Sequence, residues 1–154
     1  MATVLLSTVS SDAHTWNLVY LKLFLEEQGH RVSCLGACVP DDLLIDTALR
    51  QRPDAIVVSS VNGHGAIDGA RMIRALRAHP ELAEVPVVIG GKLGVAGDGT
   101  VQSRDLLDAG FTAVLGESGG DELVAMLANP HRPNQRGEAI RASSAPRPNL
   151  RSAA

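Results

Sequence analysis

The chain has 154 residues, the length of one ordinary domain, which leaves no room for two separate cores. Hydrophobic residues make up 45% of the chain and charged residues 20%, as in soluble globular proteins, and a net charge of -3 gives no reason to expect a nucleic-acid partner. Aromatic residues make up only 3%, so platforms on which bases could stack are not expected.

Cys34 and Cys38 are the only two cysteines, and their spacing suits neither a disulfide framework nor a zinc knuckle. We expect both to be reduced and to lie in the core. The N-terminal segment MATVLLSTVSSDAH lacks the basic start and long apolar run of a secretory signal, and no stretch is apolar over the length of a membrane span. The sequence therefore predicts a cytoplasmic protein without a membrane partner.

In chain order, the first predicted element is a strand over 3–9, followed by a helix over 15–28. Gly29 is expected to end this helix, because glycine readily takes the left-handed conformation. A strand over 31–35 follows. The next helix is expected to have Pro40 in its first turn, with the carboxylates of Asp41 and Asp42 near the positive end of the helix dipole.

The remaining segments continue the same alternation of short β-branched runs and segments of helical period. They are a strand over 55–60, a helix over 67–78, a strand over 85–89, a helix over 102–109, a strand over 113–115 and a helix over 120–127. Strict alternation predicts an α/β protein with a flavodoxin-like (Rossmann-like), doubly wound, five-stranded parallel sheet. We expect this domain to cover residues 1–128 and a flexible tail rich in proline, arginine and serine to cover 129–154.

In such a sheet, ligands bind beyond the carboxyl ends of the strands, so the loops at those ends are the candidate site. The first loop places Asp12 two residues before His14. A carboxylate bonded to one ring nitrogen raises the basicity of the other, which prepares a histidine as a metal ligand or a general base. The loop by itself equally allows Asp12 to be a helix N-cap and His14 to be a solvated side chain.

The loop after the third strand contains Ser59, Ser60 and Val61, which offer hydroxyl donors and a close approach to the backbone. Neither the glycine-lysine pattern of a phosphate-binding loop nor the dinucleotide fingerprint is present. His64, farther along this loop, is expected to be an exposed histidine rather than a ligand.

Two adjacent glycines, Gly90 and Gly91, follow the apolar run of the fourth strand. The absence of side chains there indicates either unusual backbone dihedral angles or a bulky group lying against the chain. A phosphate-accepting receiver domain has the same architecture but needs an aspartate at the end of the third strand. Ser59 and Ser60 stand there instead, which argues against that function.

Together, Asp12-x-His14-x-x-Asn17, then Ser59-x-Val61, then Gly90-Gly91 resemble the cobalamin-binding signature Asp-x-His-x-x-Gly, Ser-x-Leu, Gly-Gly. The three motifs occur in order, at the family's separations, at the ends of the first, third and fourth strands. The chain is similar to the cobalamin-binding domain family, and within it to the small subunits of glutamate (methylaspartate) mutases.

The resemblance implies that His14 is the axial ligand of cobalt, replacing the dimethylbenzimidazole of the cofactor, and that Asp12 holds its other ring nitrogen. It further implies that Ser59 hydrogen-bonds the displaced base in a slot to which Gly90 and Gly91 give room. The cofactor-binding residues implied in this way are Ser11, Asp12, Ala13, His14, Thr15, Asn17, Ser59, Ser60, Val61, Gly90, Gly91, Lys92, Leu93, Gly94, Val95 and Ala96.

Two positions depart from the signature. Val61 replaces leucine, a modest change in volume in an apolar wall. Asn17 stands where the family has glycine, beside the expected lower face of the corrin, so it bears on cofactor affinity.

The family resemblance implies the cobalamin-binding component of an adenosylcobalamin-dependent mutase that converts glutamate to 3-methylaspartate. A larger barrel-shaped subunit would bind the substrate, so no catalytic residue is expected on this chain and it should be inactive alone. Three alternatives stay open: a corrinoid carrier for methyl transfer, a cobalamin-binding regulatory module, and a domain that has lost its cofactor. The first would call for a helical cap and the second for a fused signalling segment, and neither is expected here.

Overall fold

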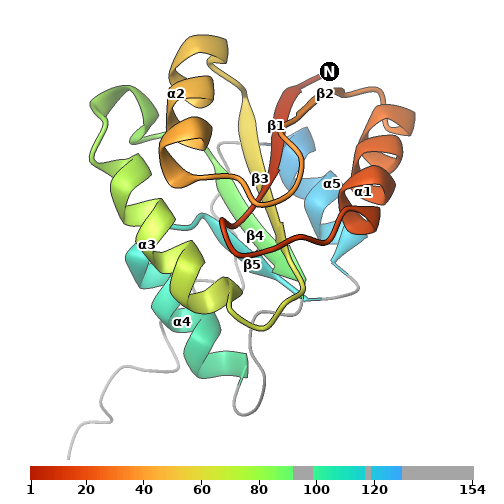
Figure 1. The fold of residues 1–154 in the computed structure, drawn as a ribbon. Helices are drawn as coiled ribbons and strands as arrows, with labels where there is room; N and C mark the ends of the chain where they lie inside the picture. The colour runs from red at the N-terminus through yellow and green to blue at the C-terminus, as the bar shows by residue number, and fades with distance from the viewer. Residues whose placement is uncertain (92–98, 117–118, 130–154) are drawn as a thin grey trace, which may run out of the picture.

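The computed structural model describes residues 1–91, 99–116 and 119–129, in which five parallel strands alternate with five α-helices (Figure 1). The elements are β1 (Thr3–Thr8), α1 (Trp16–Glu27), β2 (Arg31–Cys34), α2 (Asp41–Gln51), β3 (Ala55–Ser60), α3 (Gly65–Arg77), the 3₁₀-helix η1 (Pro80–Leu82), β4 (Val87–Gly91), α4 (Gly99–Ala109), β5 (Ala113–Leu115) and α5 (Gly120–Ala128). The strand order β2-β1-β3-β4-β5 confirms the predicted flavodoxin-like sheet.

Helices cover both faces of the sheet. Helices α1 and α5 pack on one face, and α2, α3 and α4 pack on the other (Figure 1). The inner part of the sheet is buried between the two helical layers; all six residues of the central strand β3, for example, are buried. No helix within the described ranges is long and apolar enough to cross a membrane.

The register of the sheet brings the predicted motifs to one edge. Thr8 at the end of β1 pairs with Ser59, and Ser60 at the end of β3 pairs with Gly91. Because all strands are parallel, the loops that follow them leave the sheet on the same side. The loops that carry the three motifs are therefore neighbours, although they are far apart in the sequence.

Several boundaries differ from the expected ones. Strand β4 begins at Val87 and continues through both glycines, whereas the prediction ended it before Gly90. Pro40 is the N-cap of α2 rather than part of its first turn. Gly29 follows α1 with a φ of 85°, as expected of a residue that ends a helix. The 3₁₀-helix η1 was not predicted.

The prediction that both cysteines lie in the core is wrong. Cys34 and Cys38 are free thiols, and both are exposed. Cys38 lies in the loop between β2 and α2, and Cys34 is the last residue of β2, which is at the edge of the sheet and has a strand neighbour only on the β1 side. An edge strand of this kind does not have to be buried on both faces.

Candidate functional site

Asp12 lies in the loop between β1 and α1, and its side chain is almost completely buried, with 1% exposed. Its carboxylate accepts three hydrogen bonds: from the backbone N–H of His14 at 2.9 Å, from the ring Nδ1 of His14 at 2.7 Å, and from the backbone N–H of Val61 at 2.7 Å. Burial opposes ionisation, but these hydrogen bonds outweigh it and hold the pKa of Asp12 below its ordinary value. The group is therefore a carboxylate at neutral pH.

The ionised carboxylate determines the state of the His14 ring. Because a carboxylate only accepts hydrogen bonds, Nδ1 of His14 must carry the proton that it shares with Asp12. In the neutral ring, the lone pair is then on Nε2. The His14 side chain is 59% exposed, so this arrangement presents a basic nitrogen at the surface.

The alternative in which Asp12 is a helix N-cap is wrong. Helix α1 begins at Trp16, its N-cap is Thr15, and that cap makes no side-chain hydrogen bond. Asp12 lies three residues ahead of Thr15 and faces His14 instead.

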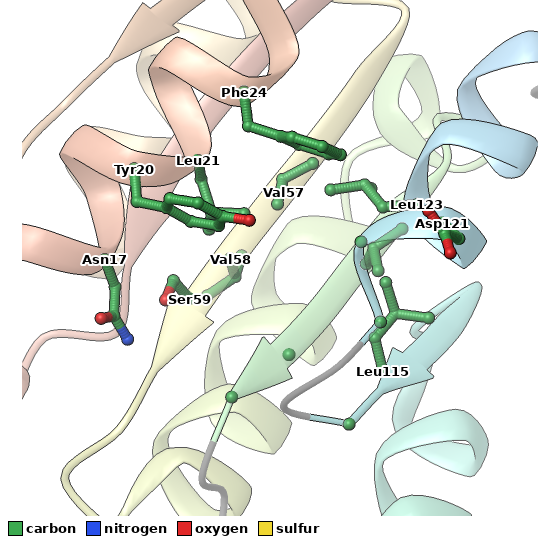
Figure 2. A pocket seen from close by; sticks show the side chains of 16 residues that line it. Asn17, Tyr20, Leu21, Phe24, Val57, Val58, Ser59, Leu115, Asp121 and Leu123 are labelled. Carbon is green, nitrogen blue, oxygen red and sulfur yellow. The ribbon is translucent and has the colours of Figure 1, made fainter.

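A cavity of about 390 Å³ opens between α1 and α5 above the ends of the central strands (Figure 2). This volume is within the range of small-molecule sites. Figure 2 shows Tyr20 and Phe24 of α1 on one side, Asp121 and Leu123 of α5 on the other, and Ser59 near the end of β3. The cavity is thus an apolar slot with a few polar groups at its walls.

Ser59 and Ser60 have different roles at the end of β3. Ser60 is fully buried, and its hydroxyl donates to the side-chain oxygen of Asn62 at 3.3 Å. Ser59 is also buried and lines the cavity, and its hydroxyl has no hydrogen-bond partner among the described residues. This hydroxyl is therefore available to a ligand in the cavity.

The two glycines of β4 are required for different reasons. Gly91 has a φ of 110°, and a Cβ there would lie 2.2 Å from the carbonyl oxygen of Ser60, so the backbone itself demands glycine. A Cβ at Gly90 would be in ordinary contact with Leu115, at 3.4 Å. Both glycines line the cavity. Gly90 accordingly matters for the room in the slot, and Gly91 mainly for the path of the chain.

The two departures from the signature are both placed in the structure. Asn17 is an exposed residue in the first turn of α1 and lines the cavity. Val61 uses its backbone N–H, not its side chain, to hold Asp12.

Of the other predicted residues, Ala13 and Thr15 are exposed in the His14 loop, while Ser11 bonds Asp68 and Asn62. His64 is exposed, as predicted, and is the N-cap of α3. Five predicted residues lie outside the part of the chain that the structure describes: Lys92, Leu93, Gly94, Val95 and Ala96.

Sequence reasoning missed the helical walls of the cavity. Tyr20 and Phe24 stack with ring centroids 6.0 Å apart, and Gly119, Gly120 and Asp121 lie opposite them at the start of α5. A signal was available, because three of the few aromatic residues of the chain recur at intervals of four in one helix. Such a stripe normally indicates a core-facing side, yet here Tyr20 is largely exposed.

Comparison with known proteins agrees with this geometry. Residues 2–122 match the profile of the family described as the B12 binding domain. The chain belongs to this family.

Two relatives are glutamate mutase sigma subunits. The protein from Escherichia coli O157:H7 is 33% identical over 136 residues, which covers 88% of this chain and 90% of the relative. The protein from Halobacterium salinarum is 34% identical over 128 residues, which covers 79% of this chain and 81% of the relative.

Solved structures support the fold. A cobalamin-binding protein from Desulfitobacterium hafniense has a TM-score of 0.65 at 22% identity, over 81% of this chain and 56% of its own. A LuxR-family response regulator from Aurantimonas has a TM-score of 0.66 at 15% identity, over 93% of this chain and 97% of its own. Because receiver and cobalamin-binding structures match the fold equally well, the residues of the loops have to distinguish them.

Proposed function

We propose that this chain is the cobalamin-binding subunit of an adenosylcobalamin-dependent carbon-skeleton mutase of the glutamate mutase type. The observation that carries the proposal is the pair formed by Asp12 and His14, which leaves the second ring nitrogen of His14 free to bind a ligand. His14 does not line the slot itself, but it lies three residues before Asn17, which does. A single nitrogen donor suits a cobalt ion whose four equatorial positions are already filled by the corrin. The sigma subunits of glutamate mutase that resemble the chain support the same assignment.

In this proposal, Nε2 of His14 would hold the cobalt of the cofactor, and Asp12 keeps the ring oriented through its hydrogen bond to Nδ1. The slot between α1 and α5 would hold the benzimidazole tail of the cofactor, and the hydroxyl of Ser59 would be a hydrogen-bond donor in its wall. The cofactor, when bound, supplies a cobalt–carbon bond that breaks homolytically. The chain holds and positions the cofactor, and by itself it converts no substrate.

A larger barrel-shaped catalytic subunit is the proposed partner. Four exposed apolar side chains support a protein partner at this site, since each lies in the opening turn of a helix and therefore at the edge of the sheet that carries the site. They are Trp16 (84% exposed), Leu43 (43%), Ile67 (73%) and Val101 (54%). Apolar groups gathered around a ligand edge are typical of a surface that another protein covers. We place the complex in the cytoplasm, where exposed free thiols stay reduced.

The binding step is tested by titrating the purified chain with adenosylcobalamin and following the absorbance change that accompanies loss of the benzimidazole ligand. Electron paramagnetic resonance of the Co(II) form, with and without ¹⁵N-histidine, identifies the nitrogen on cobalt. A change of hyperfine splitting upon labelling is expected. An unchanged splitting would reject His14 as the ligand.

The reaction is tested by adding glutamate mutase catalytic subunit from a relative and measuring 3-methylaspartate formation with adenosylcobalamin. Activity only when both proteins are present supports the mutase. If the chain instead accepts and returns a methyl group on the corrinoid and never supports rearrangement, the methyl-carrier alternative is correct.

A further inference from the structure

A second group of polar side chains lies next to the His14 loop, and no motif of the signature includes it. Arg71 of α3 donates to both carboxylate oxygens of Asp41, through Nε at 2.7 Å and Nη2 at 3.3 Å. The same guanidinium donates to Asp68 at 2.9 Å and to the hydroxyl of Ser10 at 2.8 Å. Arg71 therefore joins the start of α2, the first turn of α3 and the loop that follows β1.

Asp68 extends the group to the residue before Asp12. The hydroxyl of Ser11 donates to the second carboxylate oxygen of Asp68, and the side-chain amide of Asn62 donates to Ser11 Oγ at 3.0 Å. Ser10 and Ser11 thus each have a partner on α3. They immediately precede Asp12, which is itself bonded to the loop after β3.

The charges favour a persistent arrangement. Asp41 and Asp68 lie in the first turns of α2 and α3, where the helix dipoles stabilise a negative charge. Their side chains are only 21% and 13% exposed, respectively. Hydrogen bonds with Asp41, and secondarily with Asp68, raise the pKa of Arg71 above its ordinary value. A cation shared by two partly buried carboxylates holds its geometry better than an isolated surface pair.

We propose that Arg71 and Asp68 form a positioning clamp that sets the height and direction of the His14 ring for its metal. The inference rests on the proposed function. Residues between β1 and α1 have no regular secondary structure, and two backbone hydrogen bonds hold the loop at Asp12. Side-chain contacts of Ser10 and Ser11 therefore add to the few bonds that position His14. A metal bond tolerates deviations of only about 0.2 Å, and supporting residues must hold a ligand to within about 0.5 Å. The clamp supplies this support through Ser10 and Ser11, in addition to the bond between Val61 and Asp12.

The test compares Arg71→Ala with Arg50→Ala. Arg50 is a matched control, because it also pairs with an aspartate on its own helix, at 3.7 Å, but contacts no part of the His14 loop. Arg71→Ala is expected to weaken adenosylcobalamin binding by about tenfold, the lower end of the range for residues that orient a metal ligand. It should also broaden or diminish the histidine hyperfine splitting of bound Co(II). Arg50→Ala should change neither.

A cofactor-free measurement makes the inference independent of cobalamin binding. The amides of His14 and Val61 both donate to Asp12, so their hydrogen exchange reports how firmly the loop is held. We expect exchange to be several-fold faster in Arg71→Ala than in Arg50→Ala, at equal global stability. If Arg71→Ala does not fold, Ser10→Ala takes its place, because it removes only the hydrogen bond between the loop and Arg71. Ser10→Ala should also speed up exchange of the two amides, but by a smaller factor.

The outcomes separate the two ideas. If wild-type protein fails to bind cobalamin through histidine but the two amides still respond, the proposed function is wrong and the clamp is real. If wild-type protein binds as proposed while Arg71→Ala and Ser10→Ala match the control in both amide exchange and hyperfine splitting, the clamp is overturned. Loss of thermal stability without a change in either readout also overturns it, because that result shows a merely structural role.

Discussion

The carboxylate of Asp12 accepts a hydrogen bond from the backbone N–H of Val61 at 2.7 Å, which joins the loop after β1 to the loop after β3. Two parts of the cobalamin-binding signature are thereby linked through one buried side chain. The link uses the backbone of Val61 and therefore does not depend on whether valine or leucine stands there. This explains why the substitution in the second motif leaves the geometry of the first intact.

Replacing His14 by glutamine or alanine is expected to abolish the protein nitrogen ligand while leaving the fold intact. The His14 side chain is 59% exposed, so little packing is lost. Electron paramagnetic resonance of Co(II) should then show no histidine splitting, whereas the unfolding temperature should stay close to that of the wild type. Replacement of His64, which is exposed and whose side chain makes no capping hydrogen bond to α3, is the control and should leave the spectrum unchanged.

Asp12 should make the free energy of unfolding depend on pH in the acid range. Its pKa is lower in the folded protein than its ordinary value of 3.8, so it stabilises the fold above that pH. This stabilisation is lost as the pH falls through the lowered pKa. Chemical denaturation of the wild type and of Asp12→Asn from pH 6 down should show a shallower acid loss in the variant. Equal slopes would contradict the assignment of a lowered pKa.

The two glycines of β4 should respond differently to alanine. Gly91→Ala places a Cβ against the carbonyl of Ser60 at a positive φ, so it should destabilise the protein by about 1–3 kcal/mol or more. Gly90→Ala makes only ordinary contact with Leu115 and should fold nearly normally. It should nevertheless weaken cobalamin binding, because the methyl group occupies part of the slot. Urea denaturation and cofactor titration of both variants check this contrast.

Asn17→Gly is expected to tighten cofactor binding and to lower the stability of the cofactor-free protein. The side chain lines the slot where the family has none, and glycine inside a helix costs about 0.5–1 kcal/mol relative to alanine. Asn17→Ala is the control, because it also shortens the side chain but retains helix propensity. If affinity is unchanged or lower in the glycine variant, the asparagine is accommodated without crowding.

Truncation after Ala128, where α5 ends, should leave the fold and cobalamin binding unchanged. The removed residues contain few large apolar groups and several prolines, so they contribute little to a packed core. Thermal unfolding and cofactor titration of the shortened chain test this. Loss of binding would show that the domain boundary lies farther toward the C-terminus.

The class of fold and the pairing of Asp12 with His14 both follow from local patterns in the sequence. The alternation of apolar strands and helices predicted the sheet, and the spacing of Asp12 and His14 predicted their pairing, since residues two apart in a loop can touch. Boundaries were less accurate where glycine was involved: β4 runs through Gly90 and Gly91 because its pairing with Ser59 and Ser60 outweighs the low strand propensity of glycine.

The residues from distant parts of the chain that complete the site could not be predicted from local patterns. The slot between α1 and α5 depends on how two helices pack on one face of the sheet, and no local pattern joins Phe24 to Asp121. The contact of Arg71 with Ser10 spans 61 positions in the chain and exists because parallel strands deliver their loops to one edge. Contacts of this kind depend on the order and register of the strands. Many sequences are compatible with the same order and register, so the sequence alone does not show which distant side chains will meet.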